Sequence, residues 1–103
     1  MNVNNVIAID QVQYDLDDGE AFYNLSEPGV GTYFRDCLIS DIESLVLYAG
    51  IHSKHNGFYR MLSKRFPYAI YYDIKDVTAI VVAVLDMRRN PAWLKRKTQK
   101  RSL

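Results

Sequence analysis

Two consecutive runs of aromatic and β-branched residues, Tyr68–Ile74 and Thr78–Leu85, constrain the fold more than any other feature of this chain. Such residues suit a pleated, half-buried surface, so each run predicts a β-strand. Residues 75–77 between them leave room only for a hairpin turn, so we expect the strands to be antiparallel neighbours. Arg88 and Arg89 follow the second strand at once. Because guanidinium groups do not titrate in proteins, the pair would be a permanent charge held at the end of a rigid sheet.

The length and composition predict a single folded domain. The chain has 103 residues and 49% hydrophobic residues, and we expect a domain over residues 1–95 and a basic C-terminal tail over residues 96–103. No apolar run approaches the roughly 18 residues that cross a bilayer, and the first residues lack signal-peptide features, so we expect a cytoplasmic protein without membrane contact. The single cysteine, Cys37, excludes an internal disulfide and a multi-cysteine zinc site. We expect no metal and no cofactor.

Charge is distributed unevenly along the chain. Residues 1–51 contain nine acids and one base, a net charge of −8, and residues 52–103 contain twelve bases and three acids, a net charge of +9. The two parts sum to the +1 of the whole chain. No acid follows Asp86, so the end of the chain is typical of an interaction tail; the alternative is a solvated tail that aids solubility. We expect the residues after Lys95 to be mobile, because nothing apolar follows before Leu103.

The first half of the chain predicts one strand and two helices. Val3–Ile9 is a short apolar run typical of a strand, and Asp15–Leu25 begins with acids, which the helix dipole favours in a first turn. The internal Gly19 indicates either close packing or a weak helix. A second helix, from Gly31 onward, is predicted by apolar residues that recur at helical spacing. These residues are Val30, Phe34, Leu38, Ile42 and Leu45.

The second half predicts a three-stranded antiparallel meander. Its first strand is expected over Phe58–Arg65, followed by the two strands of the hairpin. In the last strand both alternating sets of side chains are apolar. One set is Ile80, Val82 and Val84, and the other is Val81, Ala83 and Leu85. One face should pack on the helices, and an uncovered opposite face would be an interaction surface.

Four segments, taken together in chain order, carry a family resemblance. They are Ala21–Tyr23 with the turn Glu27–Gly31 and Phe34, then Arg65–Tyr72, then Val82–Pro91, then Trp93. In this order they resemble the RelE/ParE toxins of bacterial type II toxin–antitoxin systems, a family that includes plasmid stabilisation proteins. The resemblance implies an α+β fold of βααβββ order, with a mostly antiparallel sheet and a two-helix hairpin on one face. It also implies a cognate antitoxin, with Phe22, Tyr23, Val82 and Val84 as the residues expected to bind it.

The resemblance leaves the cellular target open. RelE-like members cleave messenger RNA on the ribosome with a cationic site that includes an arginine on the central strand, and that position is Ala69 here. If the protein is a nuclease, Arg88 and Arg89 are the catalytic candidates, because they could stabilise charge on the phosphate. No base for proton transfer is evident, since His52 and His55 are expected to be solvated in a loop. The departure at Ala69 therefore favours the ParE branch, which includes poisons of DNA gyrase that bind rather than cleave.

We therefore predict a ParE-like toxin that inhibits growth by binding a protein target such as DNA gyrase. The alternatives are an endoribonuclease that acts on the ribosome and its mRNA, and an inactive relative that only binds its antitoxin. The expected target-binding residues are Arg60, Lys64, Arg65, Arg88, Arg89 and Trp93. For the basic residues the competing interpretation is ion pairing with the acidic helices. For Trp93 it is a contact that only fixes the tail to the domain.

Overall fold

The predicted hairpin forms the centre of the sheet. In the computed structural model, which describes residues 3–101, β4 (Tyr68–Lys75) pairs antiparallel with β5 (Thr78–Asp86). The sheet continues through β3 (Phe58–Leu62) to β2 (Lys54–His55), a short strand that the sequence did not predict. On the other side β1 (Asn5–Ala8) pairs with β5 in parallel, which gives the order β1-β5-β4-β3-β2. The expected mostly antiparallel sheet is confirmed.

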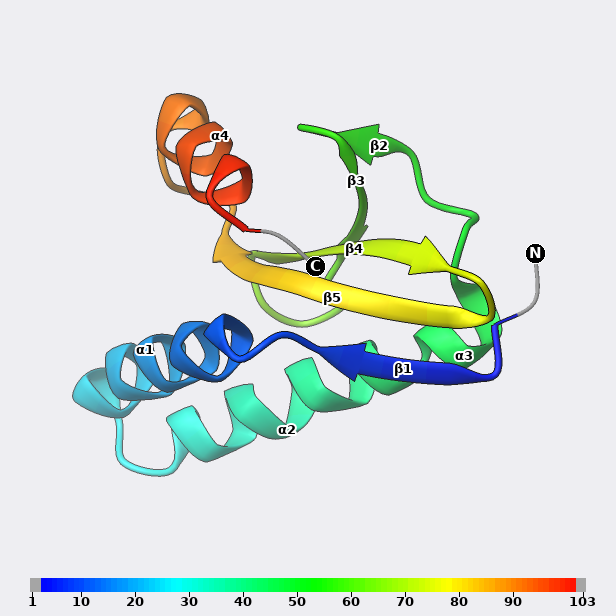
Figure 1. Ribbon diagram of the computed structural model, residues 1–103. Coiled ribbons are helices and arrows are strands. Elements are labelled where there is room, and N and C mark those ends of the chain that lie inside the picture. Colours follow the sequence, from blue (N-terminus) through cyan, green and yellow to red (C-terminus); the bar gives the residue numbers. More distant parts are fainter. Residues whose placement is uncertain (1–2, 102–103) are drawn as a thin grey trace.

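A helical hairpin covers one face of this sheet. Figure 1 shows α1 (Gln11–Ser26) and α2 (Val30–Glu43) side by side below the strands, with the short α3 (Leu45–Tyr48) continuing from α2. The helix expected over residues 15–25 begins four residues earlier, directly after β1. The α+β class and the two-helix hairpin on one face are therefore confirmed.

The larger core lies between the helical hairpin and the sheet. Phe34, Leu38 and Leu45 from the predicted apolar stripe are fully buried there. Close packing explains Gly19, because a Cβ at this position would lie 2.4 Å from the ring of Phe34. The two helices can therefore approach closely at this crossing, and the alternative of a weak helix is not needed.

A β-bulge in β5 changes which side chains face the helices. Tyr71 pairs with Ala83 and Tyr72 with Val81, so two steps along β5 oppose one step along β4. Before the bulge Val81 faces the helices, and after it Val84 does. The residues on the opposite side are Val82, Ala83 and Leu85. The prediction that Val82 and Val84 share one face, which assumed strict alternation, is wrong.

A fourth helix, α4 (Pro91–Gln99), covers part of the opposite face of the sheet (Figure 1). Its N-terminus is capped by Asn90, whose side chain accepts a hydrogen bond from the Ala92 N–H at 2.7 Å, and proline is at the first helical position. Leu94 packs on a second core, and Thr98 is fully buried with its hydroxyl donating to the Leu94 carbonyl at 2.9 Å.

The reason given for a mobile tail after Lys95, that nothing there packs on the domain, is therefore wrong for the described residues, and mobility itself stays a prediction. The boundary expected at residue 95 falls inside α4, and the helix continues to Gln99. Thr98 lies one helical turn after Leu94 and is buried beside it. The helical spacing of these two residues was overlooked because threonine is not apolar. Leu103, which entered the expectation, lies outside the described residues.

Candidate target-binding site

Arg88 directly follows β5 and is held by Asp86, the last residue of that strand. Its Nε and Nη2 atoms donate to the two carboxylate oxygens of Asp86 at 3.0 and 2.8 Å, and its backbone N–H donates to Oδ1 at 2.9 Å. These hydrogen bonds lower the pKa of Asp86 and raise the pKa of Arg88. The Arg88 side chain is 52% exposed, and its Cζ lies 5.7 Å from the ring centroid of Phe22. Arg88 is therefore both fixed and accessible.

Arg89 stacks on the first turn of α4. Its Cζ lies 3.9 Å from the ring centroid of Trp93, and the Nζ atom of Lys97 lies 5.5 Å from the same centroid. Trp93 is half-buried and also packs on the second core. The tryptophan thus fixes the helix to the domain and orients an exposed guanidinium at the same time.

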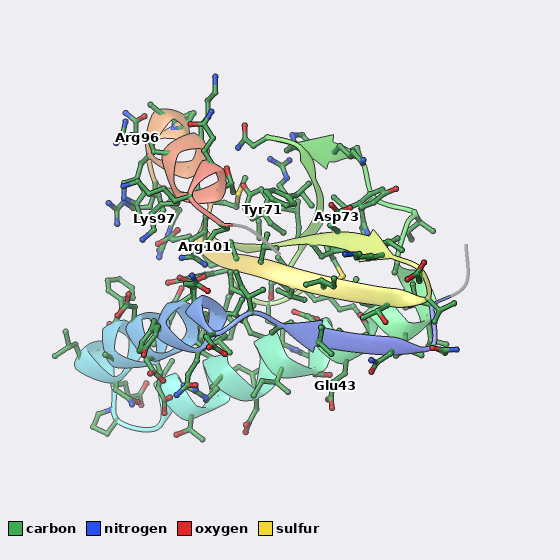
Figure 2. The ribbon with its side chains drawn as sticks, in the orientation of Figure 1. Glu43, Tyr71, Asp73, Arg96, Lys97 and Arg101 are labelled. Carbon is green, nitrogen blue, oxygen red and sulfur yellow. The ribbon has the colours of Figure 1, made fainter. Side chains whose placement is uncertain are left out.

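A cleft of about 290 Å³ separates α4 from the end of the sheet that carries β2 and β3. Its polar lining residues are His55, Asn56, Arg60, Tyr71 and Arg89. Figure 2 shows Tyr71 on the α4 side of the sheet, where its hydroxyl donates to the Met87 sulfur at 3.7 Å. Burial raises the pKa of Tyr71, and the charge of Arg60 opposes this shift. Two guanidiniums and an imidazole around one cleft are suited to bind an anion such as a phosphate.

His55 was expected to be solvated in a loop, and this is wrong. The residue belongs to β2, is half-buried and lines the cleft together with Arg60 and Arg89. Its Nε2 atom lies 3.2 Å from the Ser53 hydroxyl. The sequence carried no signal for this position, because a two-residue strand and its register on β3 depend on the tertiary fold.

Lys64 and Arg65 lie apart from the other expected target-binding residues. The strand expected over Phe58–Arg65 ends at Leu62, so Lys64 and Arg65 lie beyond the strand that carries Arg60. Instead Lys64 and Arg65 line a different cleft, beside the acidic residues of α2. The Lys64 backbone N–H donates to Asp41 at 3.4 Å. The expected basic set is therefore divided, and Arg60, Arg88, Arg89 and Trp93 remain around the start of α4.

The residues expected to bind an antitoxin differ in accessibility. Phe22 is 49% exposed on α1, and Tyr23 is half-buried against Phe66, with ring centroids 4.9 Å apart. Val82 and Val84 are 0% and 1% exposed, because α4 and the helical hairpin cover the two faces of β5. The assignment of these two valines to a partner surface is corrected. Binding through Phe22 and Tyr23 stays a prediction.

The raised pKa of Tyr68, the first residue of β4, predicts a loss of stability at alkaline pH. Burial, and next the charge of Asp86, raise the pKa of Tyr68 to about 12. The unfolded chain would release the phenol proton first, near pH 10, so ionisation favours unfolding. The contribution is present below pH 10 and is lost as the pH rises to about 12, with a total of about 2–3 kcal/mol.

Urea unfolding at pH values from 8 to 11.5 measures this loss. In the Tyr68→Phe variant the decline should be smaller, with a residual slope from Tyr23, Tyr71 and Tyr72, whose pKa values burial also raises. An unfolding free energy that stays constant through this pH range would contradict the prediction.

A metal-binding group and a membrane-spanning helix are both absent from the described residues. Residues 3–101 contain no group of three or more His, Cys, Asp or Glu side chains placed to hold a metal ion. Within the same range, no helix combines the length and the apolar character needed to span a membrane.

The fold, unlike the sequence, has a counterpart among known proteins. No family model matches the sequence, and no curated protein is similar to it. A chain in the solved structure described as the chromosomal ParDE TA system from P. aeruginosa matches with a TM-score of 0.70, covering 78% of this chain and 91% of that chain. The fold is ParE-like. With 14% sequence identity the likeness is one of architecture, and it confirms the fold that the resemblance to RelE/ParE toxins implied.

Proposed function

We propose that this protein is the toxin of a type II toxin–antitoxin pair. In this proposal it is ParE-like, inhibits growth in the cytoplasm by binding a protein target such as DNA gyrase, and is neutralised by a cognate antitoxin. The observation that carries the proposal is a ParE-like fold that presents fixed and accessible cations at the end of β5.

The geometry at the end of β5 favours binding of an acidic protein surface. Arg88 is already held by Asp86 and Arg89 by the ring of Trp93, so little side-chain entropy is lost when a partner binds them. Arginine and tryptophan are also the residue types that most often dominate binding energy at protein interfaces. At Ala69, the central-strand position where a RelE-like nuclease has an arginine, the side chain is fully buried.

One observation favours the ribonuclease as a second candidate. The cleft beside α4 brings His55, Tyr71 and Arg60 together with Arg89, which are groups that could move a proton and stabilise a phosphate. In that case the substrate is messenger RNA on the ribosome, and Arg88 and Arg89 supply positive charge.

Two assays on the purified protein separate these functions. Inhibition of gyrase supercoiling, with mRNA intact in a translation reaction mapped by primer extension, is the expected result. Cleavage of the mRNA at codon intervals would replace the proposal by the ribonuclease. A protein that neither inhibits nor cleaves, yet binds the antitoxin encoded beside it, would be the inactive relative.

The double substitution Arg88→Ala/Arg89→Ala should raise the half-inhibitory concentration at least tenfold, because it removes both fixed cations of the binding surface. It should not unfold the protein, since exposed charges contribute little to stability. The matched control is Lys64→Ala/Arg65→Ala, which removes the same charge beside α2 and should leave inhibition unchanged. Full inhibition by a well-folded Arg88→Ala/Arg89→Ala protein would remove these arginines from the site.

A further inference from the structure

The hydroxyl group of Tyr72 contacts the segment that leads from α3 to β2. Tyr72 lies on β4, on the helix side of the sheet, and is fully buried. Its hydroxyl oxygen accepts a hydrogen bond from the Gly50 N–H at 2.9 Å and lies 2.5 Å from Nδ1 of His52. The rings of His52 and Tyr72 meet edge to face, with centroids 5.6 Å apart. One core side chain thus holds two residues of the connecting segment.

These two contacts determine the protonation state that His52 needs. A tyrosine hydroxyl has a single hydrogen, and the Gly50 N–H already donates to its oxygen. The hydroxyl hydrogen therefore donates to Nδ1 of His52, and residues 3–101 offer it no other acceptor. Nδ1 can accept a hydrogen bond only while the imidazole is neutral, with its proton on Nε2.

Protonation of His52 disrupts this arrangement. An imidazolium has a hydrogen on both ring nitrogens, so Nδ1–H would point at the Tyr72 oxygen. The hydroxyl hydrogen would then have no acceptor in a fully buried place, which is unfavourable. Burial also lowers the pKa of His52. The fold therefore favours the neutral imidazole.

The charged groups around His52 do not compensate for a positive imidazole. None of the ion pairs within residues 3–101 includes His52. Lys54, on β2, places its Nζ atom 4.9 Å from the ring centroid of Tyr59, and the Tyr59 ring, on β3, stacks on Tyr72 at 5.2 Å. This neighbour has the same charge as an imidazolium. Asp73 follows Tyr72 on β4 but points to the α4 side of the sheet, as Figure 2 shows.

The other contacts of the segment are weak ones. Ile51 and Ser53 have exposed side chains. The Ile51 N–H donates to the carbonyl of Tyr48, the one titratable residue of α3, at 3.2 Å. The Arg60 N–H donates to the Ser53 carbonyl at 3.0 Å, and β2 pairs with β3 over two residues. Exposed backbone hydrogen bonds with little apolar burial open readily, so the contacts with Tyr72 matter for this segment.

We propose that His52 and Tyr72 form a pH-sensitive switch, which holds residues 50–55 on the sheet while His52 is neutral and releases them when it is protonated. The released segment includes β2, whose His55 lines the cleft beside α4 together with Asn56. Release therefore removes one wall of that cleft.

The direction of the pH dependence follows from the two states of the segment. In the released segment His52 takes up a proton near the ordinary pKa of histidine, about 6.5, and in the held segment its pKa is lower. The contribution of the switch is present above pH 6.5 and is lost as the pH falls through the lower value.

Amide hydrogen exchange of the wild-type protein at pH 7.5 and pH 5.0 tests the switch. After correction for intrinsic rates, the protection of the Gly50 and Arg60 amides should fall at least tenfold at pH 5.0. Ile70, in the central strand, should keep its protection. Nitrogen-15 spectra at pH 7.5 should show His52 protonated on Nε2 alone. Unchanged protection of Gly50 and Arg60, an equal loss at Ile70, or a proton on Nδ1 would each overturn the proposal.

His52→Asn, with His55→Asn as the matched control, separates the two histidines. An asparagine carbonyl can accept from the Tyr72 hydroxyl but does not titrate, so the His52→Asn protein should keep its Arg60 protection at pH 5.0. The His55→Asn protein should lose it as the wild type does. Tyr72→Phe lacks the hydroxyl, so its Arg60 protection should be low at both pH values. The opposite result for the two histidines, or wild-type behaviour of Tyr72→Phe, would contradict the switch.

Discussion

Replacement of Phe34 by alanine is expected to lower the free energy of unfolding by about 4 kcal/mol, because it removes a fully buried ring and leaves a cavity. The ring of Phe34 packs edge-on against Tyr68, with centroids 4.7 Å apart, and against Phe66 at 5.1 Å. Phe34 belongs to the helical layer and Tyr68 to the sheet, so the structure around Phe34 has little freedom to collapse into the space. A loss of this size is a large part of the 5–15 kcal/mol that typically stabilises a domain.

Urea unfolding of the purified variant measures this loss. The matched control is Tyr33→Ala, a neighbouring aromatic that is 49% exposed, and its cost should be about 1 kcal/mol or less. Equal losses for the two variants would mean that Phe34 is not at the centre of the core.

Gly31→Ala is expected to lower the free energy of unfolding by about 3 kcal/mol, because it adds a methyl group where no space exists for one. A Cβ at this position would lie 2.3 Å from the backbone oxygen of Glu20 and 2.6 Å from the side chain of Asn24. Backbone atoms of a helix cannot move aside as a flexible side chain can, so α1 and α2 would have to separate. The same Asn24 side chain accepts hydrogen bonds from the N–H groups of Gly29 and Gly31, and these bonds would be strained as well.

Gly29→Ala is the control for a purely conformational effect. Gly29 has a φ of 96°, but no atom lies within 4 Å of a Cβ built there. Its replacement should therefore cost only the strain of a left-handed conformation, about 1 kcal/mol. If unfolding experiments find Gly29→Ala the more damaging of the two, the close approach of the helices is not what the glycine at position 31 provides.

Much of the fold could be predicted because its signals are local. The hairpin of β4 and β5 followed from residue type and a short connection, and the burial of Phe34 and Leu38 followed from helical spacing. The bulge in β5 could not be predicted, since an uninterrupted apolar run contains no mark of an extra residue. Helix α4 was missed because its few buried contacts include a threonine, and because its strong positive charge suggested a solvated segment.

The candidate site was predictable only where its residues are adjacent in sequence. Arg88 and Arg89 follow the end of β5 directly, so the strand itself positions them. The positions of His55 and Lys64 depend on where the chain enters and leaves β3, and tertiary packing sets that path. The burial of Val82 and Val84 likewise required knowledge of both helical layers.

The extra residue in β5 could be lost without turning the side chains that follow it. Tyr72 pairs with Val81 and Tyr71 with Ala83, so removal of Val82 would leave Val81 and Ala83 as successive positions of a regular ladder. Every later residue, including Arg88 and Arg89, would keep the face of the sheet that it has now. Position 82 is therefore a place where a strand of this architecture can gain or lose one codon while the guanidiniums beyond its end keep their direction.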